Sequence, residues 1–474
     1  MIERMNGRLW DRLFVMFLVF VLMANFAAEG QEYNFYYGTL HAHSGYSDGN
    51  KDSLESGIYK PYDDFLYARE SQNFDFLGIS EHNHLAAGLV LPNYHLGLQE
   101  ANLANLDGEF VCLFGMEWGV INSGGHLIVY GFDSLVGWDP GNYDIYNAET
   151  DYQGLFEKIA QRNQTFAYLA HPQSTDYDSL FFKPYDSIID KAITAIPFRS
   201  GPAFSTSVNY DDPANGTYLS KFQTALSKGY HVGICMDHDT HNTVFGRSQA
   251  GRTGVITREL TQGSILNAYH EMNIFASDDW NAQVDFRINN KIMGSVFSGQ
   301  GQPEVTVNYL DPDGEGITQM WLYDGTPGSG LPPNLVYTIY QNQSFSFTPN
   351  LNDGETKYYY VKVQQTDGDQ MYTSPIWYTR DDDLGEKETN NLPVLQVKSG
   401  ITGDWVNINL HSNGNFNGEL KLVNQNGQQV FSEILPSTGI YSKNFTRQML
   451  GSGLFVVYLS SAEGVSISRK FVME

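Results

Sequence analysis

Histidines and carboxylates recur where short apolar segments end, and the first such place is 40-LHAHSGYSDG-49. His41 and His43 are separated by one residue, and Asp48 follows five residues later. On an extended segment, residues i and i+2 point to the same side, so both imidazoles can reach one ion. The pattern therefore predicts a metal site that begins with this pair.

Further candidate ligands stand at the ends of other apolar segments. They are Glu81 and His82 after 74–80, Glu117 after 110–116, His126 just before 127–132, His171 after 166–170, and Asp237, Asp239 and His241 after 231–236. Taken singly, each has a simpler explanation, such as a polar residue at a strand end or a helix cap. Together they are too many for one ion, so we expect two or three divalent ions. Nitrogen and oxygen donors without cysteine favour Mn²⁺, Zn²⁺ or Fe²⁺.

The segments that must position these residues alternate in type. Apolar runs such as 74-FDFLGIS-80 and 110-FVCLFGM-116 are typical of strands buried on both faces. Helical patterns lie between several of these strands, at 151–163 and 217–229. Alternating strands and helices over 31–298 predict a parallel sheet, and the number of strands favours a closed or distorted α/β barrel. In such a barrel the loops after the strands converge on one mouth.

The rest of the chain has a different texture. Residues 299–380 hold alternating strands separated by Asp/Gly turns, which predicts a small β-sandwich. An acidic linker is expected over 381–392, and a second all-β module over 393–474. The expected fold class is therefore α/β, a TIM-like barrel followed by two small all-β sandwich modules.

The first thirty residues and the composition indicate the cellular location of the protein and the classes of partner that it can bind. Arg4, Arg8 and Arg12 precede an apolar run over 13–28, which is typical of a secretory signal peptide over 1–30. No later segment is long and apolar enough for a stable membrane span. The net charge is −26, which makes nucleic acid an unsuitable partner. The chain has two cysteines, Cys112 and Cys235, both in apolar runs, which favours buried thiols over a bridge.

Five of the polar segments together resemble a known family. In chain order, TLHAHSGYSDG, GISEHN, GMEW with His126, AHP and DTH are similar to the motifs of the PHP (polymerase and histidinol phosphatase) superfamily. The resemblance covers about residues 34–297. It implies a distorted (β/α)₇ barrel, a site for two or three metal ions, and hydrolysis of phosphoesters. The segment 251–280 is similar to a branch that includes carbamate-ester hydrolases.

The resemblance also implies a ligand set. A first ion would take His41, His43, Glu117 and Asp239; a second would share Glu117 and add His126 and His171; a third would take Asp48, His82 and His241. The second motif departs from the family, because Glu81 stands where Asp is usual, so we interpret Glu81 as an outer residue. His84, Asp237 and His238 have no counterpart and are interpreted as polar loop residues.

The expected reaction is the hydrolysis of a small-molecule phosphate ester by a metal-bridged hydroxide. Asp239 or His171 would move the proton. Arg199 and Arg247 are candidates for binding the substrate anion, because the arginine fork matches phosphate oxygens. Two alternatives remain open: a carboxylic or carbamate ester hydrolase of the same fold, and a non-catalytic surface binding protein.

The C-terminal module resembles the sorting domain of the type IX secretion system. The segments LVNQNGQQVF, LGSGLFVVYLSS and SRKFVM are similar to its strand-turn-strand ending, although the usual opening Asn-Pro pair is missing from 390-NNLPVLQV-397. The resemblance implies a Gram-negative bacterium, passage through the periplasm, the type IX machinery as a partner, and a final place at the cell surface or in the medium.

Overall fold

A computed structural model describes residues 33–121, 124–173, 175–382, 394–399, 404–461 and 466–473. The chain divides into two compact units, Met1–Asp382 and Asp383–Glu474. The expected signal peptide over 1–30 and all but two residues of the expected linker over 381–392 lie outside the described residues. The two units are described separately below.

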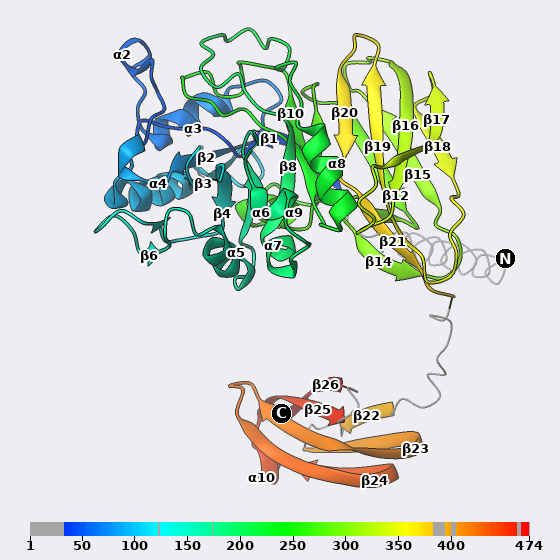
Figure 1. Cartoon of the computed structure of the whole chain (residues 1–474). Coiled ribbons are helices and arrows are strands. Elements are labelled where there is room, and N and C mark those ends of the chain that lie inside the picture. The colour runs from blue at the N-terminus through cyan, green and yellow to red at the C-terminus, as the bar shows by residue number, and fades with distance from the viewer. Residues whose placement is uncertain are drawn as a thin grey trace, which may run out of the picture. The chain divides into compact units, whose positions relative to one another are not determined.

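One mixed sheet of 15 strands runs through the first unit, in the order β14-β21-β19-β20-β11-β10-β1-β2-β3-β4-β7-β8-β9, with β16 and β17 attached beside β19 (Figure 1). The strands that lead to the candidate ligands are β1 (Asn34–Thr39), β2 (Phe76–His82), β3 (Val111–Trp118), β4 (Leu127–Tyr130), β7 (Phe166–Leu169), β8 (Ile193–Arg199) and β9 (Gly233–Met236), and they are continued by β10 (Arg252–Thr257) and β11 (Ile274–Ser277). Strands β2 and β3 are buried along their whole length, as their apolar sequences predict.

Helices follow most of the parallel strands. The longer ones are α3 (Pro61–Arg69), α4 (Leu91–Ala104), α5 (Tyr152–Ala160), α7 (Ser187–Ala192), α8 (Leu219–Lys228) and α9 (Gln262–His270), and the short ones are α2 (Ser53–Ser56), η1 (Leu85–Ala87) and α6 (Asp178–Phe181). Helix α5 buries Leu155, Phe156 and Ile159, the face that the sequence indicates. Helix α8 ends at Gly229, whose φ of 101° suits glycine in a left-handed cap.

The expected TIM-like (β/α)₇ barrel is wrong. Strands hold 41% of the residues and helices 18%, and the sheet is mixed rather than parallel. Strands β3 and β4 pair antiparallel, as do β4 and β7, β1 and β10, and β10 and β11. The connection 119–126 between β3 and β4 is short, and a parallel pair needs a crossover of a dozen or more residues. The sheet also continues beyond β11 into β20.

A β-sandwich follows the site-bearing strands within the first unit. Its smaller sheet holds β12 (Gln283–Ile288), β13 (Lys291–Ile292), β15 (Val305–Leu310) and β18 (Ser344–Phe347). Its other sheet is the far end of the large one, with β14 (Val296–Gly299), β16 (Ile317–Gly325), β17 (Asn334–Tyr340), β19 (Thr356–Gln365), β20 (Gln370–Thr373) and β21 (Ile376–Arg380). Phe286 and Val307 meet Leu322 and Val361 in the core between them. The expected boundary between 298 and 299 therefore falls inside the sandwich, which begins at β12.

The second unit is one antiparallel sheet of five strands, β22 (Val394–Ser399), β23 (Trp405–Asn424), β24 (Gln429–Thr446), β25 (Gly453–Ser461) and β26 (Ser466–Met473), with the short helix α10 (Arg447–Leu450). Its core gathers Val406, Ile408, Leu420 and Val457. A two-stranded pair, β5 (Val136–Gly137) and β6 (Ile145–Tyr146), completes the described elements of the chain. Among the described residues, no helix is long and apolar enough to cross a bilayer.

Candidate metal centre

The His41–His43 segment lies between the end of β2 and the segment that follows β9. The amide of His43 donates to the carbonyl of Thr240 at 2.8 Å, and the amide of Ser80 donates to the carbonyl of Ala42, also at 2.8 Å. Both imidazoles are fully buried. The backbone thus brings residues nearly 200 positions apart in sequence to one place, and alternation along the extended chain turns both imidazoles to one side.

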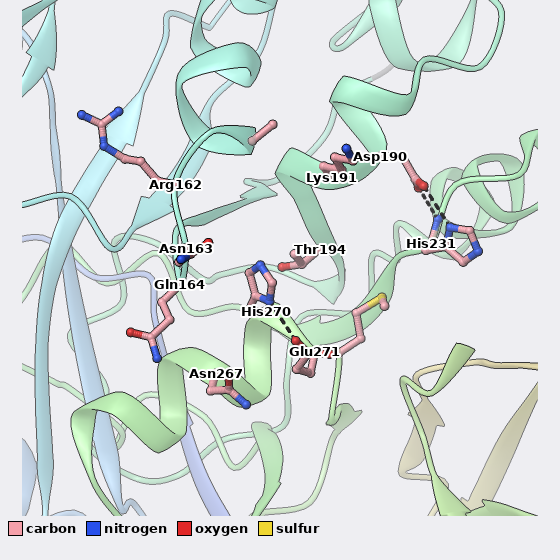
Figure 2. Close-up of a pocket in the computed structure, with 12 residues that line it drawn as sticks. Arg162, Asn163, Gln164, Asp190, Lys191, Thr194, His231, Asn267, His270 and Glu271 are labelled. Atoms are coloured by element: carbon pink, nitrogen blue, oxygen red, sulfur yellow. Dashed lines mark hydrogen bonds and ion pairs between the residues drawn. The ribbon is translucent and has the colours of Figure 1, made fainter. Parts of the chain in front are cut away.

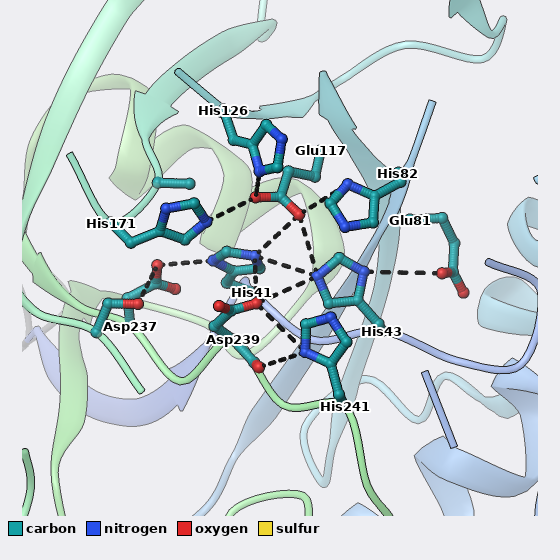
Figure 3. A network of polar contacts seen from close by, with 12 residues as sticks. His41, His43, Glu81, His82, Glu117, His126, His171, Asp237, Asp239 and His241 are labelled. Carbon is teal, nitrogen blue, oxygen red and sulfur yellow. Dashed lines mark hydrogen bonds and ion pairs between the residues drawn. The ribbon is translucent and has the colours of Figure 1, made fainter. Parts of the chain in front are cut away.

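Glu117, at the end of β3, is the centre of the arrangement (Figure 3). Its Oε2 lies 3.4 Å from His41 Nε2, 3.1 Å from His43 Nε2 and 3.2 Å from His82 Nδ1. Its Oε1 lies 2.8 Å from His126 Nδ1 and 3.1 Å from His171 Nε2. Burial raises the pKa of the Glu117 carboxyl, but the neighbouring imidazoles overcome this effect and hold the pKa well below its usual value.

Asp239 is a second shared carboxylate. Its Oδ1 lies 3.1 Å from His41 Nε2, 3.3 Å from His43 Nε2 and 3.5 Å from His241 Nδ1. Asp239 and His171 both have positive φ, 54° and 29°. Residues other than glycine rarely adopt this conformation, and such strain clusters at functional sites. The turns after β7 and β9 therefore aim these two side chains at the centre at some conformational cost.

Asp48 closes the far side of the cluster. Its Oδ1 lies 3.4 Å from His241 Nε2, 3.6 Å from His82 Nε2 and 3.9 Å from His43 Nδ1. Burial opposes ionisation of this carboxyl, but the neighbouring imidazoles of His241, His43 and His82 lower its pKa. The loop that follows the first histidine pair thus returns to the same cluster.

All nine predicted ligands fall into three overlapping groups whose donor atoms lie within 4.8 Å of one another. The groups are His41, Glu117, His171 and Asp239; His82, Glu117 and His126; and His43, Asp48, His82 and His241. The expected third set is recovered with His43 added, whereas His171 groups with His41 rather than with His126. Glu117 and His82 each belong to two groups.

The donor set fits divalent cations. Within this cluster, six buried atoms have close ionic neighbours but make no hydrogen bond of good geometry to any described residue: His43 Nδ1, Asp48 Oδ1, His82 Nδ1, Glu117 Oε2, His126 Nδ1 and Asp239 Oδ1. A buried polar atom without a partner is costly, and such a concentration of them is unusual. Cations in these groups would satisfy the lone pairs, and mixed imidazole and carboxylate donors suit Mn²⁺, Zn²⁺ or Fe²⁺.

Asp237 contacts the cluster through His41, a role that sequence reasoning did not assign to it. Its Oδ2 lies 2.7 Å from His41 Nδ1, and it also accepts hydrogen bonds at 3.3 Å from the hydroxyls of Tyr168 and Ser200. A proton on His41 Nδ1 leaves Nε2 free to act as a ligand. The interpretation of Asp237 as a polar loop residue is therefore wrong. Asp237, Asp239 and His241 occupy alternate positions of the sequence, and this pattern could have indicated that all three face the cluster.

Glu81 stands behind His43 and outside the three groups. It accepts a hydrogen bond from the amide of Ser44 at 3.0 Å, and the hydroxyls of Ser44 and Ser47 also donate to it. Its Oε2 lies 4.0 Å from His43 Nδ1. Burial raises the pKa of the Glu81 carboxyl to about 7. The carboxylate holds the loop that carries Asp48, which agrees with its interpretation as an outer residue.

The other two histidines of these motifs face elsewhere. His84 Nδ1 accepts from the amide of Ala87, and its ring stacks on Trp138. His238 is buried against Phe74, and its Nε2 donates to the carbonyl of Gly251 at 2.8 Å. Burial lowers the pKa of His238 to about 3, so this ring is neutral at physiological pH.

A cleft of about 400 Å³ opens over the centre. Ligand side chains form its floor, and its walls include Ile121, Pro202, Phe204 and Tyr218. Phe204 is 65% exposed at the rim, and its ring lies 4.8 Å from that of His241. No lysine or arginine lines the cleft among the described residues. A bound molecule would therefore meet the ligand cluster on one side and an apolar wall on the other.

The two arginines predicted to bind an anion do not reach this cleft. Arg199 pairs with Asp278, with Nε at 2.8 Å and Nη2 at 3.0 Å, and its Nη1 donates to backbone carbonyls over 214–216. Arg247 donates to the carbonyl of Tyr67 and lies over its ring. Both guanidinium groups are engaged in holding loops together.

A second cavity, of about 510 Å³, has a different character (Figure 2). Its histidines pair locally, His231 with Asp190 at 2.9 Å and His270 with its sequence neighbour Glu271 at 3.1 Å. These side chains do not converge on a common point. The cavity therefore lacks the arrangement that distinguishes the cleft over Glu117.

Comparisons with known proteins leave the function open. No family model matches the chain. An uncharacterized protein of Chlamydia trachomatis serovar D is 24% identical over 201 residues, and one of Chlamydia muridarum is 25% identical over 186; each alignment covers 36% of this chain. The chain spans 30% of the length of these curated relatives.

Two of the solved structures that are similar to the chain match it at low TM-scores. The fibronectin(III)-like modules of Clostridium thermocellum CbhA match at a TM-score of 0.18 and 9% identity, covering 40% of this chain and 94% of that one. A Parabacteroides merdae beta-glucuronidase matches at 0.19 and 8%, covering 43% and 26%.

Proposed function

We propose that this protein is a metal-dependent hydrolase that cleaves phosphate esters. The observation that carries the proposal is the set of three ligand groups that share Glu117 and His82 beneath an open cleft. A structural metal site is closed by its protein ligands, whereas a catalytic site keeps an open face. The motif order supports kinship with the PHP superfamily in its site, although not in the barrel expected with it.

Divalent ions bound in these groups would supply Lewis acidity, lower the pKa of a bound water and neutralise charge on ester oxygens. The chain's own residues divide into a fixed floor and an accessible rim. The side chains of His41 and His43 are fully buried, while those of His171 and Asp239 are 12% and 15% exposed and line the cleft. His171 and Asp239 are therefore the groups placed to hold or move a proton at the ester.

A matched set of variants tests this proposal. Purified protein is assayed for metal content and for hydrolysis of p-nitrophenyl phosphate, bis-p-nitrophenyl phosphate and an aryl ester, each with Mn²⁺ and Zn²⁺. His41→Ala should lose both bound metal and turnover. His95→Ala is the control, because His95 is a surface histidine paired with Asp144. Full turnover in metal-free His41→Ala protein contradicts the proposal.

One observation favours a second candidate, a carboxylic or carbamate ester hydrolase. The cleft offers no lysine or arginine among its described lining residues, and Phe204 presents an exposed ring at the rim. A neutral ester with an apolar group suits such a wall. Turnover of the aryl ester alone selects this candidate. Bound metal with no turnover of any of the three substrates supports a binding protein instead.

We also propose export through the type IX route, which rests on the sequence motifs over 393–474 and on the pattern of residues 1–30. In a type IX-competent bacterium, deletion of 393–474 should retain the protein in the periplasm, whereas a strain lacking the type IX machinery should retain the full chain there. Release of the truncated protein into the medium at the normal level contradicts this route.

A further inference from the structure

We propose a second cation site, specific for Ca²⁺, at the junction between the site-bearing strands and the β-sandwich. Carboxylate oxygens of Asp279, Asp311 and Glu315 lie within 4.8 Å of one another there. Asp279 follows β11, whereas Asp311 and Glu315 belong to the loop 311-DPDGEG-316 between β15 and β16. The proposal does not depend on the hydrolase activity, because it uses none of the residues beneath the cleft.

The fully buried side chain of Gln365 points to a ligand in this cluster. Its Nε2 lies 3.3 Å from Asp279 Oδ2 and 3.3 Å from Asp311 Oδ2, while its Oε1 has no hydrogen-bond partner among the described residues. Rotation of the carboxamide by half a turn exchanges these two atoms. Oε1 would then face the point where the two aspartates converge and offer a fourth oxygen to a cation, while Nε2 would take the buried place that Oε1 now holds.

The loops leave one oxygen of each aspartate for the cluster. Asp279 Oδ1 accepts from the amides of Asn281 and Ala282, both at 2.7 Å, and Asp311 Oδ1 accepts from the amide of Asp313 at 2.6 Å. The Oδ2 atoms of both are the ones that face Gln365. The backbone thus holds each carboxylate in place through one oxygen and presents the other, as in a preorganised cation site.

The cluster has negative charge without a cationic partner. Within the described residues, no lysine or arginine forms an ion pair with Asp279, Asp311 or Glu315. Burial raises the pKa of the Asp279 carboxyl, and the charge of Asp311 adds to this effect. A bound cation would offset the cost of burying the Asp279 charge and the repulsion between the Asp279 and Asp311 charges.

The donor chemistry selects Ca²⁺. Every donor is an oxygen, from carboxylates and a carboxamide, and the cluster contains no imidazole or thiolate. Such sets suit Ca²⁺, which accepts many oxygen ligands in flexible geometry, better than Mg²⁺, which retains its waters. The softer ions expected beneath the cleft prefer nitrogen.

A cation here would stabilise the junction. Asp278 precedes Asp279 and pairs with Arg199 at the end of β8, and it also accepts from the amide of Gln370 in β20. The hydroxyl of Tyr37 in β1 donates to the carbonyls of Asn281 and Ala282. The loop that carries Asp279 therefore contacts both the site-bearing strands and the sandwich.

Terbium luminescence tests the proposal, since Tb³⁺ occupies Ca²⁺ sites and is excited through nearby aromatic rings. Trp280 Nε1 donates to Asp313 Oδ2 at 2.9 Å, which places an indole at this loop. Tb³⁺ added to the full-length protein should give tryptophan-sensitised emission that Ca²⁺ suppresses at concentrations at which Mg²⁺ does not. Asp311→Asn should weaken Tb³⁺ binding by about tenfold or more.

Two further variants make the result decisive. Glu117→Gln identifies emission from the histidine cluster, since Trp118 is its neighbour, and it should leave the Ca²⁺-sensitive signal unchanged. Gln365→Glu should tighten Tb³⁺ and Ca²⁺ binding, because it adds a charged oxygen where the carboxamide faces the ion. Emission that persists in Asp311→Asn but disappears in Glu117→Gln overturns the proposal, as does weaker binding in a folded Gln365→Glu variant.

Discussion

The histidine cluster beneath the cleft and the acidic cluster at the sandwich junction differ in their donor atoms and in the backbone elements that carry them. The first places six imidazoles and three carboxylates at the ends of buried strands, with Glu117 shared among them. The second collects oxygen donors from two loops and the end of β19. Strand ends provide a rigid floor under an open cleft, which suits chemistry, whereas loops tied together by a cation suit stabilisation.

The two clusters also differ in which of their buried atoms lack a hydrogen-bond partner. Beneath the cleft, unpartnered atoms occur on both carboxylates and imidazoles, and several ions would be required to satisfy them. At the junction the unpartnered atoms are two carboxamide oxygens, Oε1 of Gln365 and Oδ1 of Asn281. Nitrogen-rich and oxygen-only sets select different cations, so the two clusters should respond to different chelators.

The largest expected effect comes from Glu117→Gln. The substitution keeps the shape of the side chain but removes the charge shared by two ligand groups, so we expect turnover to fall by about 10³-fold or more. Metal content should fall with it, while Ca²⁺-dependent stability should persist. Glu271→Gln is the matched control, because Glu271 pairs with His270 on the surface. Equal metal content in Glu117→Gln and the natural protein would show that metal binding does not depend on Glu117.

Asp237→Asn should have a smaller effect at the same centre. Asp237 touches His41 rather than an ion, and loss of such an outer partner typically costs 10–100-fold in metal affinity. Competition with a chromogenic chelator measures this affinity, and excess metal should restore turnover. Asp190→Asn removes the similar Asp–His pair of the second cavity (Figure 2) and should leave metal affinity unchanged. An unchanged affinity in Asp237→Asn would show that the contact has no role in metal binding.

Residues near a strand end were predictable because their placement is local. His82, Glu117 and His171 each follow an apolar run, and the run itself identifies the strand. Asp237 was missed because its partner His41 lies 196 positions away. The junction cluster was missed because Asp279, Asp311 and Gln365 lie in separate loops and strands with no common pattern. The prediction of a barrel was wrong because the direction of a strand depends on the connection before it, such as 119–126. Apolar periodicity identifies strands but does not specify these connections.

Chelators distinguish the two clusters. Omission of Ca²⁺ from a buffer that contains Mn²⁺ or Zn²⁺ should lower the thermal midpoint without loss of turnover, whereas 1,10-phenanthroline in a buffer that contains Ca²⁺ should abolish turnover. Calcium at ten times its Kd contributes about 1.4 kcal/mol to folding stability, which corresponds to roughly 2 °C for a unit of this size. Calorimetry with and without added Ca²⁺ measures the shift, and Asp311→Asn should not show it. A Ca²⁺ shift of equal size in Asp311→Asn would place calcium elsewhere.

The last prediction concerns the effect of pH on folding stability through Asp75, a buried carboxylate that lies in neither cluster. Asp75 accepts from the amide of Tyr37 at 2.7 Å, and burial raises its pKa to about 6 from an ordinary value near 3.8. The folded state thus binds the proton more tightly than the unfolded state, so this residue's contribution to stability falls as the pH rises from about 4 to 6. Asp75→Asn retains an acceptor for Tyr37 and should be more stable by up to about 3 kcal/mol at pH 7, with the gain vanishing near pH 4. Urea unfolding across this pH range measures the difference, and a gain that persists at pH 4 would mean that burial of the charge is not its cause.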